Sequence, residues 1–239
     1  ELGVFTEIVP YYATYDEIMK NQPEGLIISG GQFSVYDENS PKYTEKIFES
    51  GIPILGICYG QQSIAHILGG KVILSNRREY GETKITIEKE SSLFKGINKK
   101  ELTVWMSHGD IVESLPEGFE VVSRSQNEHI SSMQNAQRKI YAVQFHPEVD
   151  HTEHGRIILN NFIDICNAKR TWNPDKEYER VVEEIKTKLS GKIGIGGISG
   201  GVDSTTASIL LGDIVGNNFH PIFVDNGLLR HQEAERVKE

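Results

Sequence analysis

The stretch Ile54-Leu55-Gly56-Ile57-Cys58-Tyr59-Gly60 decides the fold of the first part of the chain. It is an apolar run that ends at a cysteine between two glycines, and the residues from Gln61 to Leu68 follow at helical spacing. A buried strand, a sharp turn and a helix are predicted, because glycine permits the backbone conformations that a tight strand-to-helix turn needs. A cysteine on such a turn stands clear of neighbouring side chains, which predicts a thiol nucleophile at Cys58.

The same order of elements recurs elsewhere. Leu26-Ile27-Ile28 runs into Ser29-Gly30-Gly31, and the apolar run from Ile140 to Phe145 leads into His146. Strands that alternate with helical patterns are typical of βα units in a parallel sheet. Between Lys71 and Val122 the pattern changes to strand-like alternation, which predicts antiparallel additions to that sheet.

A helix predicted from Gly155 to Ala168 closes the first of two expected domains, residues 1–169. Residues 170–239 begin a second one, with helical spacing up to Leu189 and a glycine-rich strand before Ser199. We therefore expect an α/β protein with two domains, each a mostly parallel, doubly wound sheet.

Composition excludes several classes of function. The 239 residues carry a formal net charge of −9, and the basic pairs Arg77-Arg78 and Lys99-Lys100 are not extended into a basic block, which argues against nucleic-acid binding. The apolar runs are far shorter than the ~20 residues of a membrane helix. The two cysteines are too few for a disulfide framework, and no secretory signal is evident. We expect a cytoplasmic protein that contacts neither membrane nor nucleic acid.

Cys58 requires a base, and His146-Pro147-Glu148 supplies an imidazole with a carboxylate two residues later. Glycine N–H groups at Gly30-Gly31 and at the cysteine turn are suited to an oxyanion. The alternative is that Cys58 is a small buried apolar residue, as we expect for Cys166 on an apolar helix face. A catalytic set in the order Cys, His, Glu is favoured, because all these features occur together.

A second loop, Ser199-Gly200-Gly201-Val202-Asp203-Ser204-Thr205, follows an apolar strand and opens a helix. Glycines let successive backbone N–H groups converge on an anion, the helix N-terminus adds positive potential, and the hydroxyls add donors. The loop lacks the Gly-Lys-Ser/Thr ending of a Walker A sequence. The alternative is a tight connection without a ligand.

Gly-Ile-Cys-Tyr-Gly-Gln-Gln together with Phe-His-Pro-Glu resembles the class I glutamine amidotransferases, which release ammonia from the glutamine side chain through a cysteine thioester. The resemblance implies that Cys58 is the nucleophile, His146 the general base and acid, and Glu148 the residue that orients it. It also implies an oxyanion hole at the N–H groups of Gly31 and Tyr59. The residues that it implies for binding L-glutamine are Gln62, Ser107, His108 and Asp110.

Ser-Gly-Gly-Val-Asp-Ser resembles the PP-loop of ATP pyrophosphatases, and the two motifs together resemble the glutamine-hydrolysing GMP synthetase family over essentially the whole chain. The resemblance implies that ATP adenylates XMP, and that ammonia then displaces AMP to give GMP. It implies Mg²⁺ at Asp203. The residues that it implies for ATP are Ser199, Gly200, Gly201, Val202, Asp203, Ser204, Thr205 and Val224.

Family segments are expected on both sides of this sequence: a first strand before Glu1, and a C-terminal domain that binds XMP and forms a homodimer after Glu239. Two other functions remain open. One is an amidotransferase that supplies ammonia to a different adenylated acceptor, and the other is a non-catalytic sensor of glutamine and nucleotide. Labelling of Cys58 by a glutamine-like electrophile would argue against the sensor. Pyrophosphate release that requires XMP would argue against a different acceptor.

Overall fold

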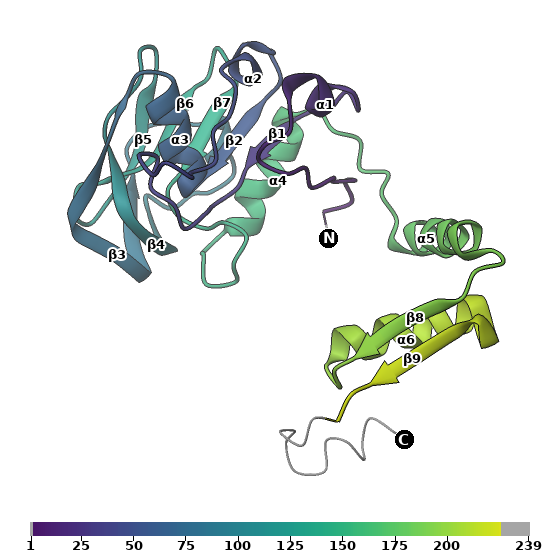
Figure 1. Ribbon diagram of the computed structural model, residues 1–239. Helices are drawn as coiled ribbons and strands as arrows, with labels where there is room; N and C mark the ends of the chain where they lie inside the picture. The colour runs from purple at the N-terminus through teal and green to yellow at the C-terminus, as the bar shows by residue number, and fades with distance from the viewer. Residues whose placement is uncertain (1, 226–239) are drawn as a thin grey trace. The chain divides into compact units, whose positions relative to one another are not determined.

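The computed structural model describes residues 2–225, which divide after Arg170 into two compact units (Figure 1). The elements of the first unit are α1 (Tyr15–Met19), β1 (Leu26–Ile28), α2 (Lys46–Glu49), β2 (Ile54–Ile57), α3 (Tyr59–Ile67), β3 (Lys71–Ile87), the 3₁₀ turn η1 (Ser92–Phe94), β4 (Glu101–Ser114), β5 (Glu120–Ser125), β6 (Ile130–Asn135), β7 (Ile140–Val143) and α4 (Gly155–Ile165). Those of the second are α5 (Pro174–Leu189), β8 (Gly194–Ile198), α6 (Val202–Val215), the 3₁₀ turn η2 (Gly216–Asn218) and β9 (Phe219–Phe223).

The sheet of the first unit is mixed. Its strand order is β1-β2-β7-β6-β5-β3-β4, and only the neighbours β1, β2 and β7 pair in parallel. The remaining pairs are antiparallel, so the expectation of a mostly parallel sheet is wrong for this unit. The antiparallel additions predicted between Lys71 and Val122 are present. They include the long strands β3 and β4, of 17 and 14 residues.

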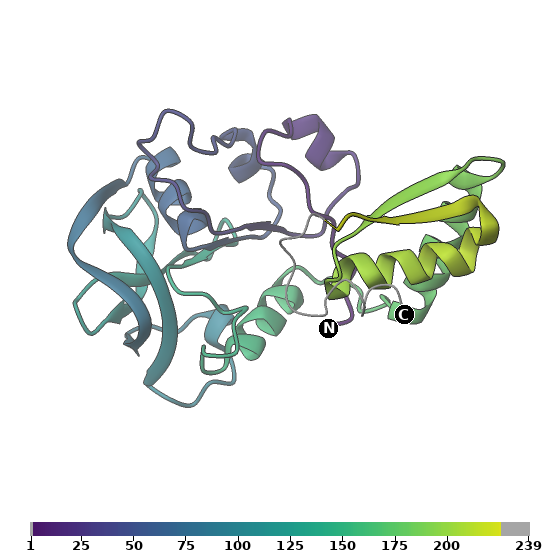
Figure 2. The same cartoon turned by 60° about the horizontal axis from the view of Figure 1, so that its bottom comes forward.

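The two faces of the sheet bury different apolar clusters. Leu55 and Ile57 of β2 point into a cluster with Ile158 and Phe162 of α4, whereas Ile54 joins the cluster that contains residues of α3. This alternation follows from the two-residue period of a strand. Figure 2 shows α3 and α4 on opposite sides of the sheet, so both faces of its parallel part are covered by helices.

The turn from β2 into α3 depends on close contact between the helix and the sheet. A Cβ atom at Gly60 would overlap the carbonyl group of Ile28 in β1, and one at Gly56 would stand 2.6 Å from Cδ1 of Ile64. Glycine at these two positions therefore lets α3 begin directly against the sheet. Between them, Cys58 has φ 52° and ψ −106°, outside the regions that most residues adopt.

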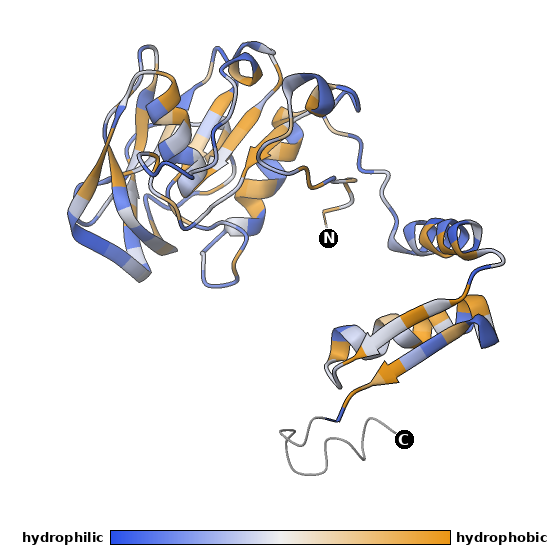
Figure 3. Ribbon diagram, viewed as in Figure 1, coloured by the Kyte–Doolittle hydropathy of each residue, from blue (hydrophilic) through white to orange (hydrophobic). Residues whose placement is uncertain are grey.

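The second unit contains two parallel strands, β8 and β9, connected through α6. Asn173 caps α5 by accepting from the N–H of Asp175, and Pro174 occupies the first turn, as the sequence predicts. The ring of Phe219 lies against Gly196, where a Cβ atom would stand 2.6 Å from it. Figure 3 shows the apolar residues of α5 gathered along one side of that helix.

Two predicted helix boundaries differ from the structure. α4 ends at Ile165, three residues before the expected end, because Asn167 adopts a positive φ of 53°. α6 begins at Val202 rather than near Thr205, so the last residues of the glycine-rich loop form its first turn. Among residues 2–225, no helix combines the length and apolar character that crossing a membrane requires.

Replacement of Gly60 by alanine is expected to destabilise the first unit by about 2–3 kcal/mol, since the added methyl group meets backbone atoms of β1 that cannot move independently. Urea unfolding followed by circular dichroism measures the change. Gly212→Ala in α6 is the control, because a Cβ atom there meets nothing within 4 Å. That control is expected to be neutral or up to about 1 kcal/mol stabilising. Equal effects of the two changes would contradict the packing argument.

Candidate active site

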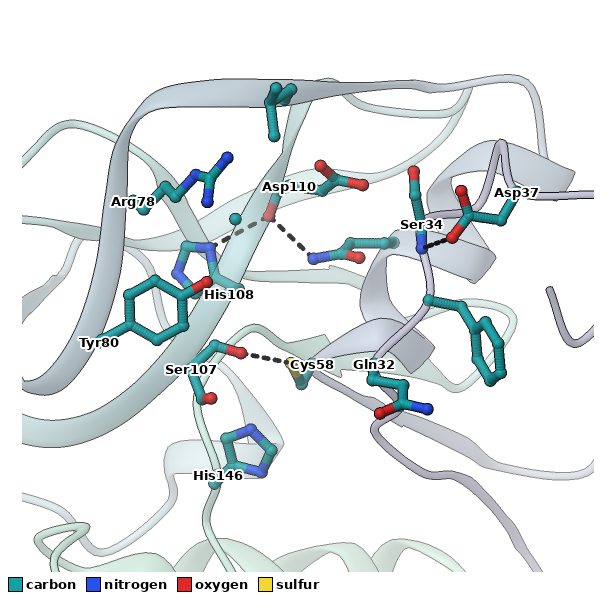
Figure 4. Close-up of a pocket in the computed structure, with 15 residues that line it drawn as sticks. Gln32, Ser34, Asp37, Cys58, Arg78, Tyr80, Ser107, His108, Asp110 and His146 are labelled. Atoms are coloured by element: carbon teal, nitrogen blue, oxygen red, sulfur yellow. Dashed lines mark hydrogen bonds between the residues drawn. The ribbon is translucent and has the colours of Figure 1, made fainter.

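A cavity of about 610 Å³ opens where the three parallel strands end. The segments after β1, β2 and β7 carry Gly31, Cys58 and His146 to this edge, and β3 and β4 form the opposite wall (Figure 4). The volume lies within the usual range of small-molecule pockets. The lining residues are Gly31, Gln32, Phe33, Ser34, Asp37, Cys58, Gln62, Leu74, Arg78, Tyr80, Ser107, His108, Gly109, Asp110 and His146.

Cys58 is the N-cap of α3 and lines this cavity although only 4% of its surface is exposed. Its backbone N–H donates to the carbonyl of Val143 in β7 at 2.8 Å, which ties the turn to the sheet. The thiol donates to the carbonyl oxygen of Ser107 at 3.6 Å, and the side-chain amide of Gln144 donates to the sulfur at 3.7 Å. The sulfur thus has two polar partners, although Cys58 also belongs to the apolar cluster that contains Leu55 and Ile57.

His146 lies in the segment after β7, and two contacts hold its backbone. Its N–H donates to the carbonyl of Trp105 in β4 at 3.0 Å, and its carbonyl accepts from the hydroxyl of Thr152 at 2.6 Å. The ring Nδ1 lies 2.7 Å from Oε1 of Glu148, so the carboxylate fixes the ring and leaves Nε2 for another partner. This is the arrangement expected from the His-Pro-Glu sequence.

The electrostatics of His146 follow from these neighbours. The neighbouring side chain of Cys58, followed by that of Glu148, raises the pKa of His146 from 6.5 to about 10, against the effect of burial. Near neutral pH the protonated form of the ring is therefore favoured beside the sulfur. Cys166 differs, because burial raises the pKa of its thiol to about 12 and its side chain packs against the α4 cluster. It is placed for packing, as expected.

The two residues of the predicted oxyanion hole lie next to each other. A Cβ atom at Gly31 would stand 3.7 Å from the ring of Tyr59, and Tyr59 begins α3 directly after Cys58. The first N–H groups of a helix lack acceptors within the helix, and no side chain caps α3. Gly30 gives the thiol and the imidazole room, because a Cβ atom there would stand 3.3 Å from Cε1 of His146 and 3.6 Å from Cβ of Cys58.

The four residues predicted to bind glutamine all line the cavity. The amide nitrogen of Gln62 donates to the carbonyl of Asp110 at 2.8 Å and to Oε1 of Gln144 at 3.3 Å. Nδ1 of His108 lies 3.1 Å from the same Asp110 carbonyl. Two of the four side chains therefore hold the backbone of β4 in place, in addition to facing the cavity.

Sequence reasoning missed several residues of the site. Gln144 contacts both Cys58 and Gln62, and Arg78, Tyr80 and Asp37 line the cavity. Gln144 lies two residues before His146 in an extended segment, so the strand period was a signal that could have found it. The segment Asn76-Arg77-Arg78-Glu79-Tyr80-Gly81 resembles the family in sequence, but that resemblance assigned no role to Arg78 or Tyr80, because the pairing of β3 with β4 is what brings them to the cavity.

In the second unit, the predicted phosphate-binding residues lie between β8 and the first turn of α6. Gly200 has φ +79°, Gly201 is the N-cap, and no side chain caps this 14-residue helix. The hydroxyls of Ser199 and Ser204 lie 3.1 Å apart. Val224, which the resemblance also implies for ATP, follows β9 and is exposed.

Replacement of Glu148 by glutamine is expected to lower the pKa of His146 by about one unit, because one of two partners that stabilise the imidazolium is lost from a half-exposed position. The ring then loses its proton at a lower pH. Titration of the imidazole nitrogens by NMR measures the shift. Glu153→Gln is the matched control, since Glu153 pairs with Lys99. An equal change in the pKa of His146 in both variants would contradict the assignment of Glu148 as the partner of that ring.

The sequence model of the family "Glutamine amidotransferase class-I" matches residues 1–166. Over 240 aligned residues, the chain is 45% identical to the GMP synthase [glutamine-hydrolyzing] of Brachyspira hyodysenteriae and 47% identical to that of Aquifex aeolicus. Both alignments cover 100% of this chain, but only 46% and 47% of the two relatives, respectively. The chain thus spans about half the length of the curated relatives it matches.

Among solved structures, a candidate GMP synthase polypeptide of Thermoplasma acidophilum superposes with a TM-score of 0.58. It is 33% identical in sequence, and the match covers 74% of this chain and 84% of that one. The amidotransferase resemblance indicated by the motifs is confirmed by these matches. The chain belongs to the class-I glutamine amidotransferase family.

Proposed function

We propose that the first unit hydrolyses the side-chain amide of L-glutamine to glutamate and ammonia, with Cys58, His146 and Glu148 as the catalytic set. One observation carries the proposal. Cys58 stands at the N-terminus of α3 in a cavity that it shares with His146, and Glu148 lies 2.7 Å from the ring of that histidine. A thiol, a base and a group that orients the base are the parts that acyl transfer to cysteine requires.

The reaction has two steps. With the thiol proton already held on His146, the sulfur of Cys58 forms a bond with the amide carbon of glutamine while the carbonyl oxygen gains negative charge near the N–H groups of Gly31 and Tyr59. The carbon–nitrogen bond then breaks, and the leaving nitrogen takes the proton from His146 to depart as ammonia. In the second step, water loses a proton to His146 and attacks the thioester, which releases glutamate and restores the thiol.

The wall of the cavity suits an amino-acid substrate. Arg78 supplies a positive charge there, whereas Asp37 and Asp110 supply carboxylates. Glutamine carries an α-carboxylate and an α-ammonium group in addition to the reacting amide, and a wall with both signs of charge is complementary to both groups. The proposal therefore places the amide at Cys58 and the α-carbon end toward β3 and β4.

Replacement of Cys58 by alanine in the full-length enzyme is expected to abolish glutamine-driven product formation, while synthesis from added ammonium chloride stays within about twofold of the unchanged protein. The physical reason is that free ammonia bypasses the thioester. Cys166→Ala is the matched cysteine control and is expected to keep both activities. Loss of the ammonia-driven activity in Cys58→Ala would argue against two separable sites, and retention of glutamine use would argue against Cys58 as the nucleophile.

The second unit is proposed to bind ATP at residues 199–205. The support is the glycine-rich loop before α6, where backbone N–H groups in the first turn have no side-chain acceptor. Asp203, in that first turn, would hold Mg²⁺ together with phosphate oxygens, and the ion would neutralise charge on the departing pyrophosphate. The hydroxyls of Ser199, Ser204 and Thr205 would donate to phosphate oxygens, and Val224 would contact the adenine.

For the whole protein we propose GMP synthesis, in which ATP adenylates XMP and ammonia from the first unit displaces AMP. The relatives named above are GMP synthases, and their similarity to this chain extends through residues 171–239. A homodimer is proposed on the family resemblance alone.

Asp203→Asn in the full-length enzyme is expected to reduce pyrophosphate release by about a hundredfold, because a charged ligand of the ion is removed. Glutamine hydrolysis at Cys58 is expected to continue in this variant. The measurement is pyrophosphate release with ATP and Mg²⁺, with and without XMP. In the unchanged enzyme, pyrophosphate release that does not require XMP would indicate a different acceptor. Absence of release from the unchanged enzyme with any acceptor would overturn the ATP proposal.

A further inference from the structure

A buried ion pair lies behind the wall of the cavity, outside the proposed catalytic set. Oε2 of Glu79 in β3 is 3.0 Å from Nε2 of His108 in β4, and both side chains are at most 2% exposed. Oε1 of Glu79 accepts from the hydroxyl of Ser125 at 2.6 Å and from the side-chain amide of Asn127 at 2.9 Å. His129 lies 3.5 Å away but outside hydrogen-bonding geometry. The carboxylate therefore accepts three hydrogen bonds, and all three come from side chains of the protein.

The carboxylate of this pair is ionised. Burial by itself would raise the pKa of Glu79, but the hydrogen bonds from His108, Ser125 and Asn127 lower it to about 2. The two ring nitrogens of His108 face the Glu79 carboxylate and the carbonyl of Asp110, and both of these groups only accept hydrogen bonds. The ring is therefore placed to donate at both nitrogens.

This pair is connected to the cavity by hydrogen bonds. His108 holds the carbonyl of Asp110, which also accepts from the amide of Gln62 at 2.8 Å. Gln62 continues to Gln144, whose amide donates to the sulfur of Cys58 at 3.7 Å. Figure 4 shows the Asp110 carbonyl between the His108 ring and a neighbouring amide. Glu79 thus lies at the buried end of a chain that ends at the thiol.

Glu79 also stands where the β3–β4 ladder is interrupted. Leu74 pairs with Asp110 and Glu79 pairs with His108, so β3 has three more residues than β4 over this interval. Ladder hydrogen bonds are lost in such a bulge. Arg78, the last residue of the bulge, lines the cavity, and within the described residues no hydrogen bond or ion pair holds its side chain. The side chain of Glu79 replaces the missing ladder contacts at this point.

From these observations we propose that Glu79 is a positioning residue for glutamine. It fixes His108 and the β3 bulge, so that Asp110, Gln62 and Arg78 keep the arrangement that receives the α-carbon end of the substrate. The inference rests on the proposed glutamine hydrolysis. It differs from a role in stability alone, because a positioning residue changes substrate binding more than it changes the chemistry at Cys58.

Glu79→Gln in the full-length enzyme tests the proposal. The neutral amide keeps the size of the side chain but not the ion pair. KM for glutamine is expected to rise by about tenfold, with kcat reduced by no more than about threefold. Alkylation of Cys58 by iodoacetamide, which needs the thiol but not the glutamine contacts, is expected to stay within about twofold. A fall in kcat at unchanged KM, or alkylation that slows in parallel with turnover, would overturn the proposal.

Two further variants separate positioning from general destabilisation. Ser123→Ala removes a buried hydroxyl that bonds only to Ser131 and Ser132 among the described residues, and it is expected to leave KM unchanged. Glu79→Asp keeps the charge on a shorter side chain and is expected to give a smaller rise in KM than Glu79→Gln. If Glu79→Gln does not fold, Glu79→Asp decides: a raised KM with normal alkylation supports the proposal, and an unchanged KM overturns it. Absence of glutamine hydrolysis in the unaltered enzyme would instead count against the proposed function.

Discussion

The close approach of α3 to the sheet at Gly56 and Gly60 is the constraint on which the site depends. Because no Cβ atom separates the helix from β1, the chain reverses within one residue, and Cys58 takes up the positive φ of 52°. Its N–H is bound to Val143 of β7, so the turn cannot relax away from the sheet. The strain at one residue is offset by packing that involves the two glycines and both neighbouring strands, which is the condition under which strained residues persist.

The antiparallel part of the sheet belongs to the site as much as the parallel part does. β4 supplies the Ser107 carbonyl beside the thiol, and its Trp105 carbonyl binds the N–H of His146. Thr152 then bridges the two segments, since its hydroxyl donates to the His146 carbonyl and accepts from the Trp105 N–H. The imidazole is therefore placed by β4 rather than by β7 alone. A mixed sheet serves here because its antiparallel strands form the wall opposite the three strand ends that carry Gly31, Cys58 and His146.

The parts that sequence predicted are those with a local signal. Cys58, Gly30-Gly31 and His146-Pro147-Glu148 each follow an apolar run directly, and helix starts such as Asn173-Pro174 are defined by neighbours in sequence. Glu79 had no such signal, because its partners are 29, 46 and 48 residues away in sequence. Its burial depends on the register of β3 against β4 and on the bulge before it, which alternation alone does not determine. For the same reason the mixed character of the sheet was underestimated.

Two hydrogen-bonded carboxylate–imidazole pairs in the described part of the first unit have opposite designs, and the contrast explains their separate tasks. Glu79 is 2% exposed and is held by three donors, so its pair with His108 is costly to break and has one arrangement. Glu148 is 48% exposed and, among the described side chains, has His146 as its partner. Water can relax around that second pair as the imidazole gains and loses a proton, whereas burial keeps solvent away from the Glu79–His108 pair. A rigid pair is suited to holding a binding wall, and a solvated pair is suited to proton transfer.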